Sequence, residues 1–352
     1  MRTGYKRIIS LLLLIVMIST LAACSPSQPA KSGSESTSPT ESGSETTQPS
    51  ESGSESSGSE SNSGDLEKVA YIPGDMANES QAFSAKMFKK HADEYGFDVT
   101  VLDGKADAQV QAQLVNNAIA QNIKAIFLNP NDINAIIPSL DAAKKAGLIV
   151  GLYSSDLPEE AWDCRDFFVG VDDNEAGESA AQAFMDAFPN GAKIVEIGGQ
   201  AGHDAQIKRH DGFNEKIKGT NIEVLAYQAT SAWSTAEAMA IMEDFIVKYG
   251  DKIDGVFCHW DNGATGVIEA IKAASLNKDI FIVAVDGCRA GFDQVKEGTQ
   301  AVTVMQDFEA QAVKTLEVTR AILDGKNYEK LNFVPLNIVT KDNINDYPYP
   351  EW

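Results

Sequence analysis

The sequence predicts an α/β protein built as two doubly wound parallel-sheet lobes. Along residues 66–352, short apolar runs rich in Val and Ile alternate with longer amphipathic segments, the spacing of right-handed βαβ units. The runs are continuously apolar, as in strands buried between two layers of helices. They are too numerous for one modest sheet. A closed (β/α)₈ barrel also fits the length and the alternation, so periodicity alone leaves both architectures open.

Each element follows from its own pattern. The expected strands are Lys68–Ile72, Asp98–Leu102, Ala125–Leu128, Ile149–Tyr153, Phe167–Val169, Lys193–Ile197, Ile222–Tyr227, Ile253–Cys258, Phe281–Val285 and Ala301–Met305. The expected helices are Ser80–Tyr95, Val110–Gln121, Ile133–Ala146, Glu175–Ala187, Ala205–Ile217, Thr235–Lys248, Ala264–Ala274 and Glu309–Leu323. The third helix should stop at Gly147, because glycine readily adopts the left-handed conformation that ends a helix.

Residues 1–24 have the pattern of a secretory signal. A basic start is followed by an apolar run that is short for a membrane-spanning helix, which needs about 20 residues. The ending Leu21-Ala22-Ala23-Cys24 resembles a bacterial lipobox. That resemblance implies that Cys24 becomes the first mature residue and carries diacylglycerol on its sulfur. An ordinary secretion signal and an uncleaved anchor are the alternatives.

Residues 25–65 are expected to form a flexible linker. Residues 25–64 contain 16 Ser, 5 Gly and 4 Pro, and a repeated Glu-Ser-Gly-Ser-Glu. Such a segment cannot bury enough surface to offset its chain entropy, and it should span about 35 Å as a tether. A lipid-anchored protein on the extracytoplasmic face of a bacterial membrane follows, and the tether length favours a Gram-positive surface.

The net charge of the chain is -22, from 51 acidic and 29 basic residues. This excess of acids disfavours binding to nucleic acid or to anionic lipid by charge, because nothing would neutralise the phosphates. It fits a soluble monomer. No spacing of His, Cys, Asp or Glu resembles a metal site, and we expect no cofactor.

The residues that follow the expected strands are strongly polar. Ligands of open α/β sheets bind beyond the carboxyl ends of the strands, so these residues are the candidates for a binding site. The candidate ligand-binding residues are Asn78, Gln81, Asn129, Ser154, His203, Arg209, Trp233, Trp260, Asp261, Asp286 and Gln306. Amides, carboxylates and an arginine pair with hydroxyl groups, and indole faces pack on the C–H faces of a pyranose. This mixture fits a neutral polyhydroxylated ligand better than a phosphate.

Residues 66 to about 325 resemble a type I periplasmic binding protein of the ribose- and galactose-binding kind. The motifs that carry the resemblance lie in family order along the chain. They are Asn129-Pro130-Asn131-Asp132, Val169–Asn174, Gly202-His203 with Arg209, Ala232–Ala238, Asp261 with Gly266, and Val285-Asp286-Gly287. The resemblance implies an extracytoplasmic receptor that captures a small sugar between two lobes and presents it to the permease of an ABC transporter.

The resemblance also implies residue roles and domain boundaries. It places Arg209, Trp233, Asp286 and Gln306 on ligand contacts, and Asn78, Asn129, His203 and Asp261 at or near them. It implies that the last helix crosses back, so that both lobes are discontinuous and joined by a multi-strand hinge. The N-terminal lobe is then 66–172 plus about 307–335, and the C-terminal lobe 173–306 plus about 336–352.

The chain departs from the family's pattern at three places. Ser80 and Gln81 stand where aromatic residues are usual, Ser154-Ser155 stands where the family often has Asp-Arg or Asn-Lys, and Trp260 replaces an asparagine before Asp261. We infer a shifted ligand, either a different monosaccharide or a short oligosaccharide. The calcium loop of the galactose-binding proteins is not recognisable.

Several candidates also have plain structural interpretations. Arg209 could pair with Asp211 or Glu215, Trp260 could fill the core, and Asp286 could cap a turn. His203 could be an ordinary loop residue, and Asn129 could start the Asn-Pro turn. Of the other cysteines, which are Cys164, Cys258 and Cys288, the last two could form a disulfide or remain free thiols.

Four other interpretations compete with sugar transport. The acids of the cleft and His203 could be assembled into a glycosidase site, but no catalytic motif is present and we do not expect an enzyme. A receptor that signals to a membrane kinase or chemoreceptor would use the same closed conformation. A non-sugar ligand such as an autoinducer would also fit the fold. A repressor is disfavoured, because no helix-turn-helix precedes residue 66.

Overall fold

A computed structural model describes residues 66–276 and 278–352. The expected signal segment 1–24, the lipidation site Cys24 and the linker 25–65 lie outside the described residues. Within the part that is described, no helix is both long enough and apolar enough to cross a membrane.

The first lobe is built on a six-stranded sheet with the order β11-β5-β4-β3-β1-β2. Its strands are β1 (Glu67–Ile72), β2 (Phe97–Val101), β3 (Ala125–Leu128), β4 (Ile149–Tyr153), β5 (Phe167–Gly170) and β11 (Leu331–Phe333). All neighbouring strands run parallel, and Ala70 of β1 lies opposite both Thr100 of β2 and Ile126 of β3.

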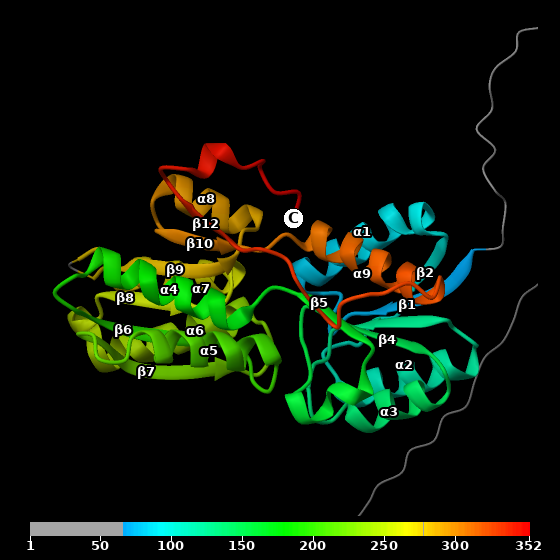
Figure 1. The fold of residues 1–352 in the computed structure, drawn as a ribbon. Helices are drawn as coiled ribbons and strands as arrows, with labels where there is room; N and C mark the ends of the chain where they lie inside the picture. Colours follow the sequence, from blue (N-terminus) through cyan, green and yellow to red (C-terminus); the bar gives the residue numbers. More distant parts are fainter. Residues whose placement is uncertain (1–65, 277) are drawn as a thin grey trace, which may run out of the picture. The chain divides into compact units, whose positions relative to one another are not determined.

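Helices cover both faces of this sheet (Figure 1). One face carries α1 (Glu79–His91) and α9 (Phe308–Leu323), and the other carries α2 (Ala108–Ala120) and α3 (Ile137–Lys145). Along β1, Tyr71 packs with the first pair of helices and Ile72 with the second. Both faces of the strand are therefore buried, which explains its continuous apolar sequence.

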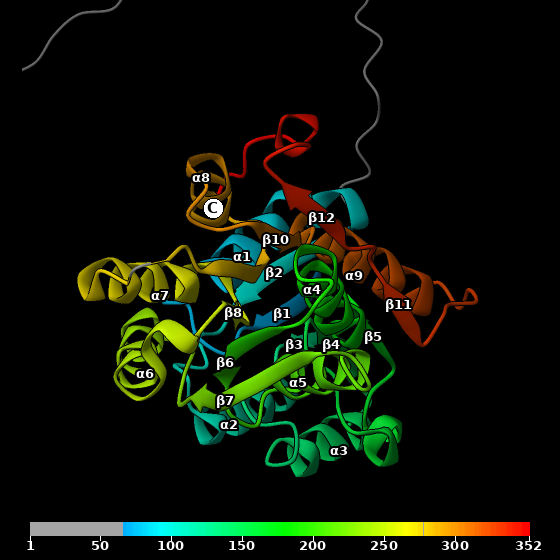
Figure 2. The same cartoon turned by 90° about the vertical axis from the view of Figure 1, so that its left-hand side faces the viewer.

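The second lobe has its own six-stranded sheet, with the order β12-β10-β9-β8-β6-β7. Its strands are β6 (Ala192–Gln200), β7 (Ile222–Thr230), β8 (Gly255–Cys258), β9 (Phe281–Asp286), β10 (Val302–Met305) and β12 (Asn337–Thr340). Figure 2 shows α4 (Asp173–Ala187) and α5 (Asp204–Lys216) on one face, and α6 (Thr235–Tyr249) and α7 (Asp261–Ala274) on the other. The helix α8 (Arg289–Glu297) packs with β12 at one edge.

The edge strand β12 departs from the expected all-parallel sheets. It runs antiparallel to β10, with Asn337 opposite Met305. Only three residues separate it from β11 of the first sheet. The chain therefore joins the second sheet at the carboxyl end of β10 and has to run back, since a parallel strand would need a long crossover.

The expected elements exist, with shifts at their ends. The helix expected from Ile133 begins at Ile137 instead. Pro138 explains this, because proline has no N–H to donate and is tolerated in the first turn of a helix. The helix α8 and the strands β11 and β12 were not among the expected elements.

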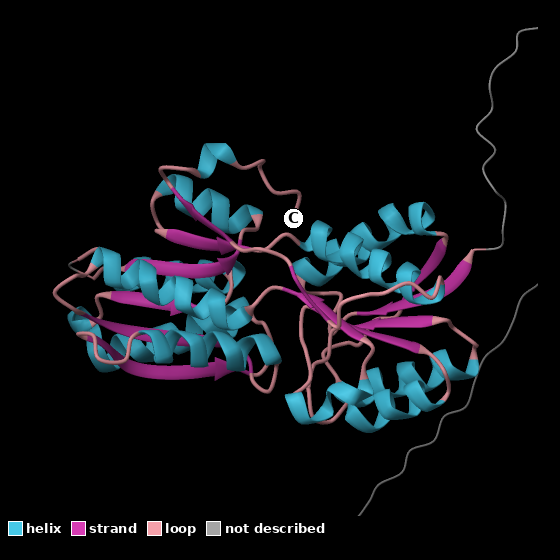
Figure 3. Cartoon of the chain, in the orientation of Figure 1, coloured by secondary structure: helices cyan, strands magenta, loops and turns pink. Residues whose placement is uncertain are grey.

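The chain passes between the two sheets three times: between β5 and α4, between β10 and α9, and between β11 and β12. Each sheet is open, with different strands at its two edges, so the closed-barrel alternative is wrong. Figure 3 shows strands and helices alternating in both lobes. The two doubly wound lobes and the multi-strand connection between them are as the sequence predicts.

Candidate ligand-binding site

A cavity lies where carboxyl ends of strands from both sheets meet. Its empty space is about 360 Å³, part of which is open to solvent. Ten of the eleven candidate residues line it: Asn78, Gln81, Asn129, Ser154, His203, Arg209, Trp233, Trp260, Asp286 and Gln306. Ser80, Ala205 and Phe308 complete the lining. We call this space the inner cavity.

The wall from the first lobe consists largely of amides that are already engaged. Asn78 caps α1, where its Oδ1 accepts hydrogen bonds from the backbone N–H groups of Ser80 and Gln81. The Oε1 of Gln81 accepts from the N–H groups of Gly74 and Asp75. These carbonyl oxygens hold the loop after β1, so the amide nitrogens are what the two side chains can offer a ligand.

His203 positions Asn129 across the cavity. Its Nδ1 accepts a hydrogen bond from the N–H of Ala205, so the proton is on Nε2, which lies 3.0 Å from Oδ1 of Asn129. Burial, with a smaller contribution from the positive charge of Arg209, lowers the pKa of His203 to about 3. The imidazole is therefore neutral at physiological pH and acts as a hydrogen-bond donor rather than as a proton shuttle.

Arg209 is fixed by two partners in the second lobe. Its Nε donates to Oδ1 of Asp173 at 2.8 Å, and its Nη1 donates to the backbone carbonyl of His259. The expected structural alternatives, Asp211 and Glu215, are not its partners. The side chain is only 4% exposed, and the rest of its fork of N–H groups can serve a ligand in the cavity that it lines.

Two glycines allow this ion pair to form. A Cβ on Gly177 of α4 would lie 2.2 Å from the backbone oxygen of Arg209, and one on Gly212 of α5 would lie 2.3 Å from that of Asn174. Real side chains do not approach backbone this closely, so both positions need glycine. The close packing of α4 on α5 brings Asp173 to Arg209 from 36 residues away.

A buried polar group supports the carbonyl that holds Arg209. His259 is fully buried and its Nε2 lies 3.0 Å from Oε1 of Glu196, which also contacts His210. Burial acts to raise the pKa of Glu196, but the hydrogen bonds from His210 and His259 outweigh it and keep that pKa below its usual value. An ionised carboxylate thus anchors the strand end beneath the arginine.

Two indoles form the aromatic part of the wall. The rings of Trp233 and Trp260 meet edge to face, with centroids 5.5 Å apart. A Cβ on Gly199 would lie 2.1 Å from the ring of Trp233, so the indole can lie on strand β6 only because that residue is glycine. Trp260 belongs to the core and also lines the cavity, so the core position and the cavity position that the sequence suggested for it are both found. Its Nε1 is buried and has no hydrogen-bond partner within the described residues.

Asp286 is held in an unusual backbone conformation at the end of β9. Its φ is 130°, a region that favours glycine, and such strain tends to occur at functional sites. Its Oδ1 accepts from Nε2 of Gln306 at 3.0 Å, while the buried Oε1 of Gln306 has no partner in the described chain. Burial raises the pKa of Asp286 to about 8, although Arg209 acts to lower it. At neutral pH this carboxyl group is largely protonated and can donate a hydrogen bond.

Asp261 is the one candidate that the structure places outside the cavity. It is the first residue of α7, and its fully buried carboxylate turns away toward the loop after β9. There it accepts from the N–H groups of Gly287 and Cys288 and from the hydroxyl of Thr303. It therefore holds the turn that carries Asp286. A strand-end carboxylate can serve a loop as well as a ligand, and the motif does not distinguish the two.

Sequence reasoning missed several participants. Asp173 and His259 hold Arg209, and Phe308 closes the cavity at the start of α9. Phe308 follows β10 by three residues, so its place after a strand end was a usable signal. Nothing local in the sequence connects Asp173 with Arg209.

The described residues contain no group of three or more His, Cys, Asp or Glu side chains placed to hold a metal ion. Cys164, Cys258 and Cys288 are free thiols, so the open question of a disulfide between the last two is decided. Burial raises the pKa of the Cys258 thiol, which keeps it protonated and unreactive.

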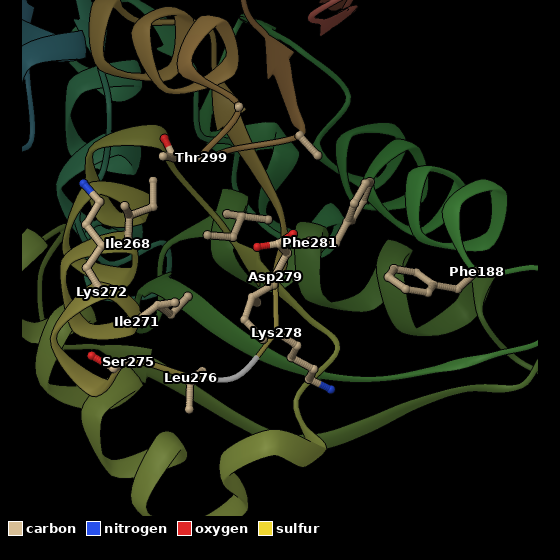
Figure 4. Close-up of a pocket in the computed structure, with 14 residues that line it drawn as sticks. Phe188, Ile268, Ile271, Lys272, Ser275, Leu276, Lys278, Asp279, Phe281 and Thr299 are labelled. Carbon is tan, nitrogen blue, oxygen red and sulfur yellow. The ribbon is translucent and has the colours of Figure 1, made fainter.

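A larger cavity, of about 1,230 Å³, lies at the amino end of the second sheet (Figure 4). Side chains of α7 such as Ile268 and Ile271 form one side, Phe188 lies on the other, and Phe281 lies between them. Its lining is mainly aliphatic and aromatic. It lacks the converging amides and carboxylates of the inner cavity, and it lies away from the strand ends where α/β ligands bind. The inner cavity is therefore the candidate binding site despite its smaller volume.

Comparison with known proteins identifies the class that this fold and site define. Residues 69–327 match the family described as periplasmic binding protein domain, which covers most of the chain. The chain belongs to this family.

Individual relatives agree with that assignment. The chain is 29% identical to the ribose import binding protein of Bacillus subtilis over 256 residues, which cover 73% of this chain and 81% of the relative. An ABC transporter solute binding protein from Bacillus halodurans, solved with bound myo-inositol, superposes with a TM-score of 0.74 at 25% identity, covering 80% of this chain and 97% of that one. A galactofuranose binding protein has the same fold, with a TM-score of 0.75 at 24% identity over 80% of this chain and 96% of that one. These relatives are binding proteins.

Proposed function

We propose that this protein is the extracytoplasmic receptor of an ABC importer and captures a small sugar or polyol between its lobes. The observation that carries the proposal is the inner cavity, where Arg209, a protonated Asp286 and two indoles meet amides from the other lobe. Groups that both donate and accept hydrogen bonds suit vicinal hydroxyls, and indole faces suit a sugar ring. The ribose, myo-inositol and galactofuranose ligands of the relatives support this class of solute.

The receptor works by closure of the lobes, 66–172 plus about 307–335 and 173–306 plus about 336–352, about the three connecting segments. Hydrogen bonds already join the lobes around the cavity. Asp204 accepts from the N–H of Asp156, and Nε2 of Gln200 donates to the carbonyl of Asn131. A ligand that bridges both walls adds to these bonds only in the closed arrangement, so binding shifts the population toward it.

The receptor is a monomer tethered through diacylglycerol on Cys24, and the 25–65 segment spaces the lobes from the membrane. The basic, apolar and small-residue order of residues 1–24 supports this anchor. Cys24→Ser should move the protein from the membrane fraction to the soluble fraction of a bacterial host that processes lipoproteins. Unchanged membrane association would contradict lipid anchoring at this residue.

A thermal-shift screen of the purified full chain tests the function. The panel contains D-ribose, D-xylose, D-galactose, xylitol and myo-inositol. A ligand at 100 times its Kd adds about 2.7 kcal/mol to the free energy of unfolding, which is readily measured. We expect at least one stabilising compound and no hydrolysis of chromogenic glycosides. Turnover would support a glycosidase, and no stabilisation by any compound would contradict the proposed function.

A further inference from the structure

The segment Tyr347–Trp352 forms a strap that starts on the second lobe. Tyr349 lies on α8, where its hydroxyl donates to the carboxylate of Asp293 at 3.0 Å and Nζ of Lys296 lies 4.8 Å from its ring centroid. Arg289 at the start of α8 holds the next residues. Its Nε donates to the carbonyl of Pro350 at 3.0 Å, and its backbone N–H donates to the carbonyl of Trp352 at 2.6 Å. The strap is thus fixed to the second lobe by side chains and backbone.

The other end of the strap reaches the first lobe. The indole of Trp352 stacks on Phe83 of α1, with centroids 5.8 Å apart and an interplanar angle of 20°. It also meets Phe308 of α9 edge to face at 5.1 Å. Glu351 forms an ion pair of 2.7 Å with Lys86 of α1. These contacts place the half-buried indole against α1 and α9 of the first lobe.

This indole lines a second space, which we call the outer chamber. The chamber has about 630 Å³ of empty space, part of it open to solvent, and it adjoins the inner cavity, because Asn78, Ser80, Trp233, Trp260 and Asp286 line both.

Glu79, Thr235, Asn262, Thr265 and Trp352 line only the outer chamber. The Nδ2 of Asn262 donates to Oε2 of Glu79 at 3.1 Å, so residues of both lobes meet there. Three indoles therefore surround a space lined by hydroxyl, amide and carboxylate groups, the same mixture that lines the inner cavity.

We propose that the outer chamber binds a second sugar ring, so that the preferred ligand is a two-ring saccharide or glycosylated polyol. The first ring occupies the inner cavity beside Arg209 and Asp286, and the second ring packs on Trp352. This inference rests on the proposed function. The inner cavity alone is small, and Trp260, whose buried Nε1 has no partner in the described chain, lines both spaces. The second ring of the ligand would lie in the larger outer chamber.

Calorimetric titration of the full chain with matched pairs tests the proposal. The pairs are D-xylose with xylobiose, D-galactose with melibiose or lactose, and myo-inositol with galactinol. We expect at least one two-ring compound to bind at least about tenfold more tightly than its single ring, equivalent to about 1.4 kcal/mol.

Two variants then locate the second ring. Trp352→Ala should lower the affinity for the two-ring compound at least about fivefold and the affinity for its single ring less than about twofold, because an aromatic face packs on a sugar. Trp352→Phe, which keeps an aromatic ring, should have an intermediate effect. Asn262→Phe fills the chamber and should have the same selective effect on affinity. It replaces Trp352→Ala as the test if that variant fails to fold. Val247→Ala on the exposed side of α6 is the matched control and should change neither affinity.

The possible failures are distinguishable. If single rings bind and every two-ring partner binds more weakly, the second-ring site is wrong and the proposed function stands. An equal loss of affinity for the two-ring compound and for its single ring in Trp352→Ala also overturns the second-ring site, because the strap would then act on lobe closure and not on the second ring. No binding by any compound contradicts the proposed function and the chamber together.

Discussion

The two walls of the inner cavity use their polar groups differently. In the first lobe, Asn78 and Gln81 direct their carbonyl oxygens to their own loop, and Asn129 accepts from His203. In the second lobe, Arg209 keeps part of its fork available, and Trp260 has a buried N–H without a partner in the described chain. The polar groups of the first wall largely have partners within the protein already, whereas the second wall has donors that a ligand can satisfy.

This difference indicates how much each lobe contributes to the binding free energy. A buried donor without a partner costs free energy that a ligand recovers, so the second lobe should supply most of the affinity. The first lobe should mainly close over the ligand and exclude water. Substitutions on the two walls should therefore have unequal effects on affinity, and the following four test that inequality.

The largest loss should come from Arg209→Ala. Hydrogen bonds from a charged group contribute about 1.5–3 kcal/mol each, so affinity should fall roughly 10- to 150-fold in calorimetric titration. The substitution also leaves Asp173 buried without its partner, which lowers stability. Arg209→Lys keeps the charge without the fork and should show the affinity loss in a better folded protein. Lys216→Ala on the same helix is the control, and an unchanged affinity in both Arg209 variants would show that the site is misassigned.

Trp260→Phe removes the unpartnered Nε1 and keeps an aromatic ring. The binding free energy should become less favourable by about 0.5–1.5 kcal/mol, the usual contribution of one neutral hydrogen bond. Trp162→Phe is the matched control, because its Nε1 already donates to the carbonyl of Leu157. Equal affinities of the Trp260 variant and the wild type would show that the ligand does not use this N–H.

Asp286→Asn should alter the pH dependence of stability more than it alters affinity. Unfolded aspartate has a pKa near 4 and Asp286 has one of about 8, so its contribution to stability is complete below pH 4 and is lost as the pH rises toward 8. Arg209, Asp261, Asp173 and Gln306 surround this carboxyl group, and burial is the main cause of the shift.

Asparagine stays neutral, so the stability of Asp286→Asn relative to the wild type should rise with pH by up to about 1.4 kcal/mol per unit between pH 5 and 8. Urea unfolding of both proteins at four pH values measures this difference, and affinity at pH 7 should change less than about threefold. Parallel stability curves would mean that Asp286 is already ionised at neutral pH.

Gln81→Ala should have the smallest effect on affinity. It leaves the N–H groups of Gly74 and Asp75 without their acceptor, which should cost about 1–3 kcal/mol of stability. Affinity measured well below the melting temperature should change by less than about twofold, because the side chain serves its own loop. Gln109→Ala on an exposed position of α2 is the control. A loss of affinity as large as that of Arg209→Ala would abolish the distinction between the walls.

The sequence predicts the fold and most of the cavity for one physical reason. Parallel strands buried on both faces leave continuous apolar runs, and the polar residues that follow them must gather at one edge of the sheet. This places Asn129, Trp233 and Asp286 without knowledge of the tertiary structure. Asn129 and Trp233 are in loops directly after β3 and β7.

The remaining features depend on contacts between distant segments. The approach of α4 to α5 through Gly177 and Gly212 determines that Arg209 pairs with Asp173. The side chain of Asp261 points toward the loop after β9 because backbone N–H groups of that loop donate hydrogen bonds to it. The strap that ends in Trp352 has no periodic pattern, and only its contacts with α1 and α8 reveal where it lies. Local patterns carry none of this information.

A crystal structure of the full chain with the tightest compound from the panel tests the central claim most directly. We expect the ligand in the inner cavity, with hydroxyl groups within hydrogen-bonding distance of Arg209, Trp260 Nε1 and Gln306 Oε1, and a ring face on Trp233. Ligand density in the cavity between Phe188 and Ile268 instead, or an inner cavity that holds only water under saturating ligand, would contradict the account.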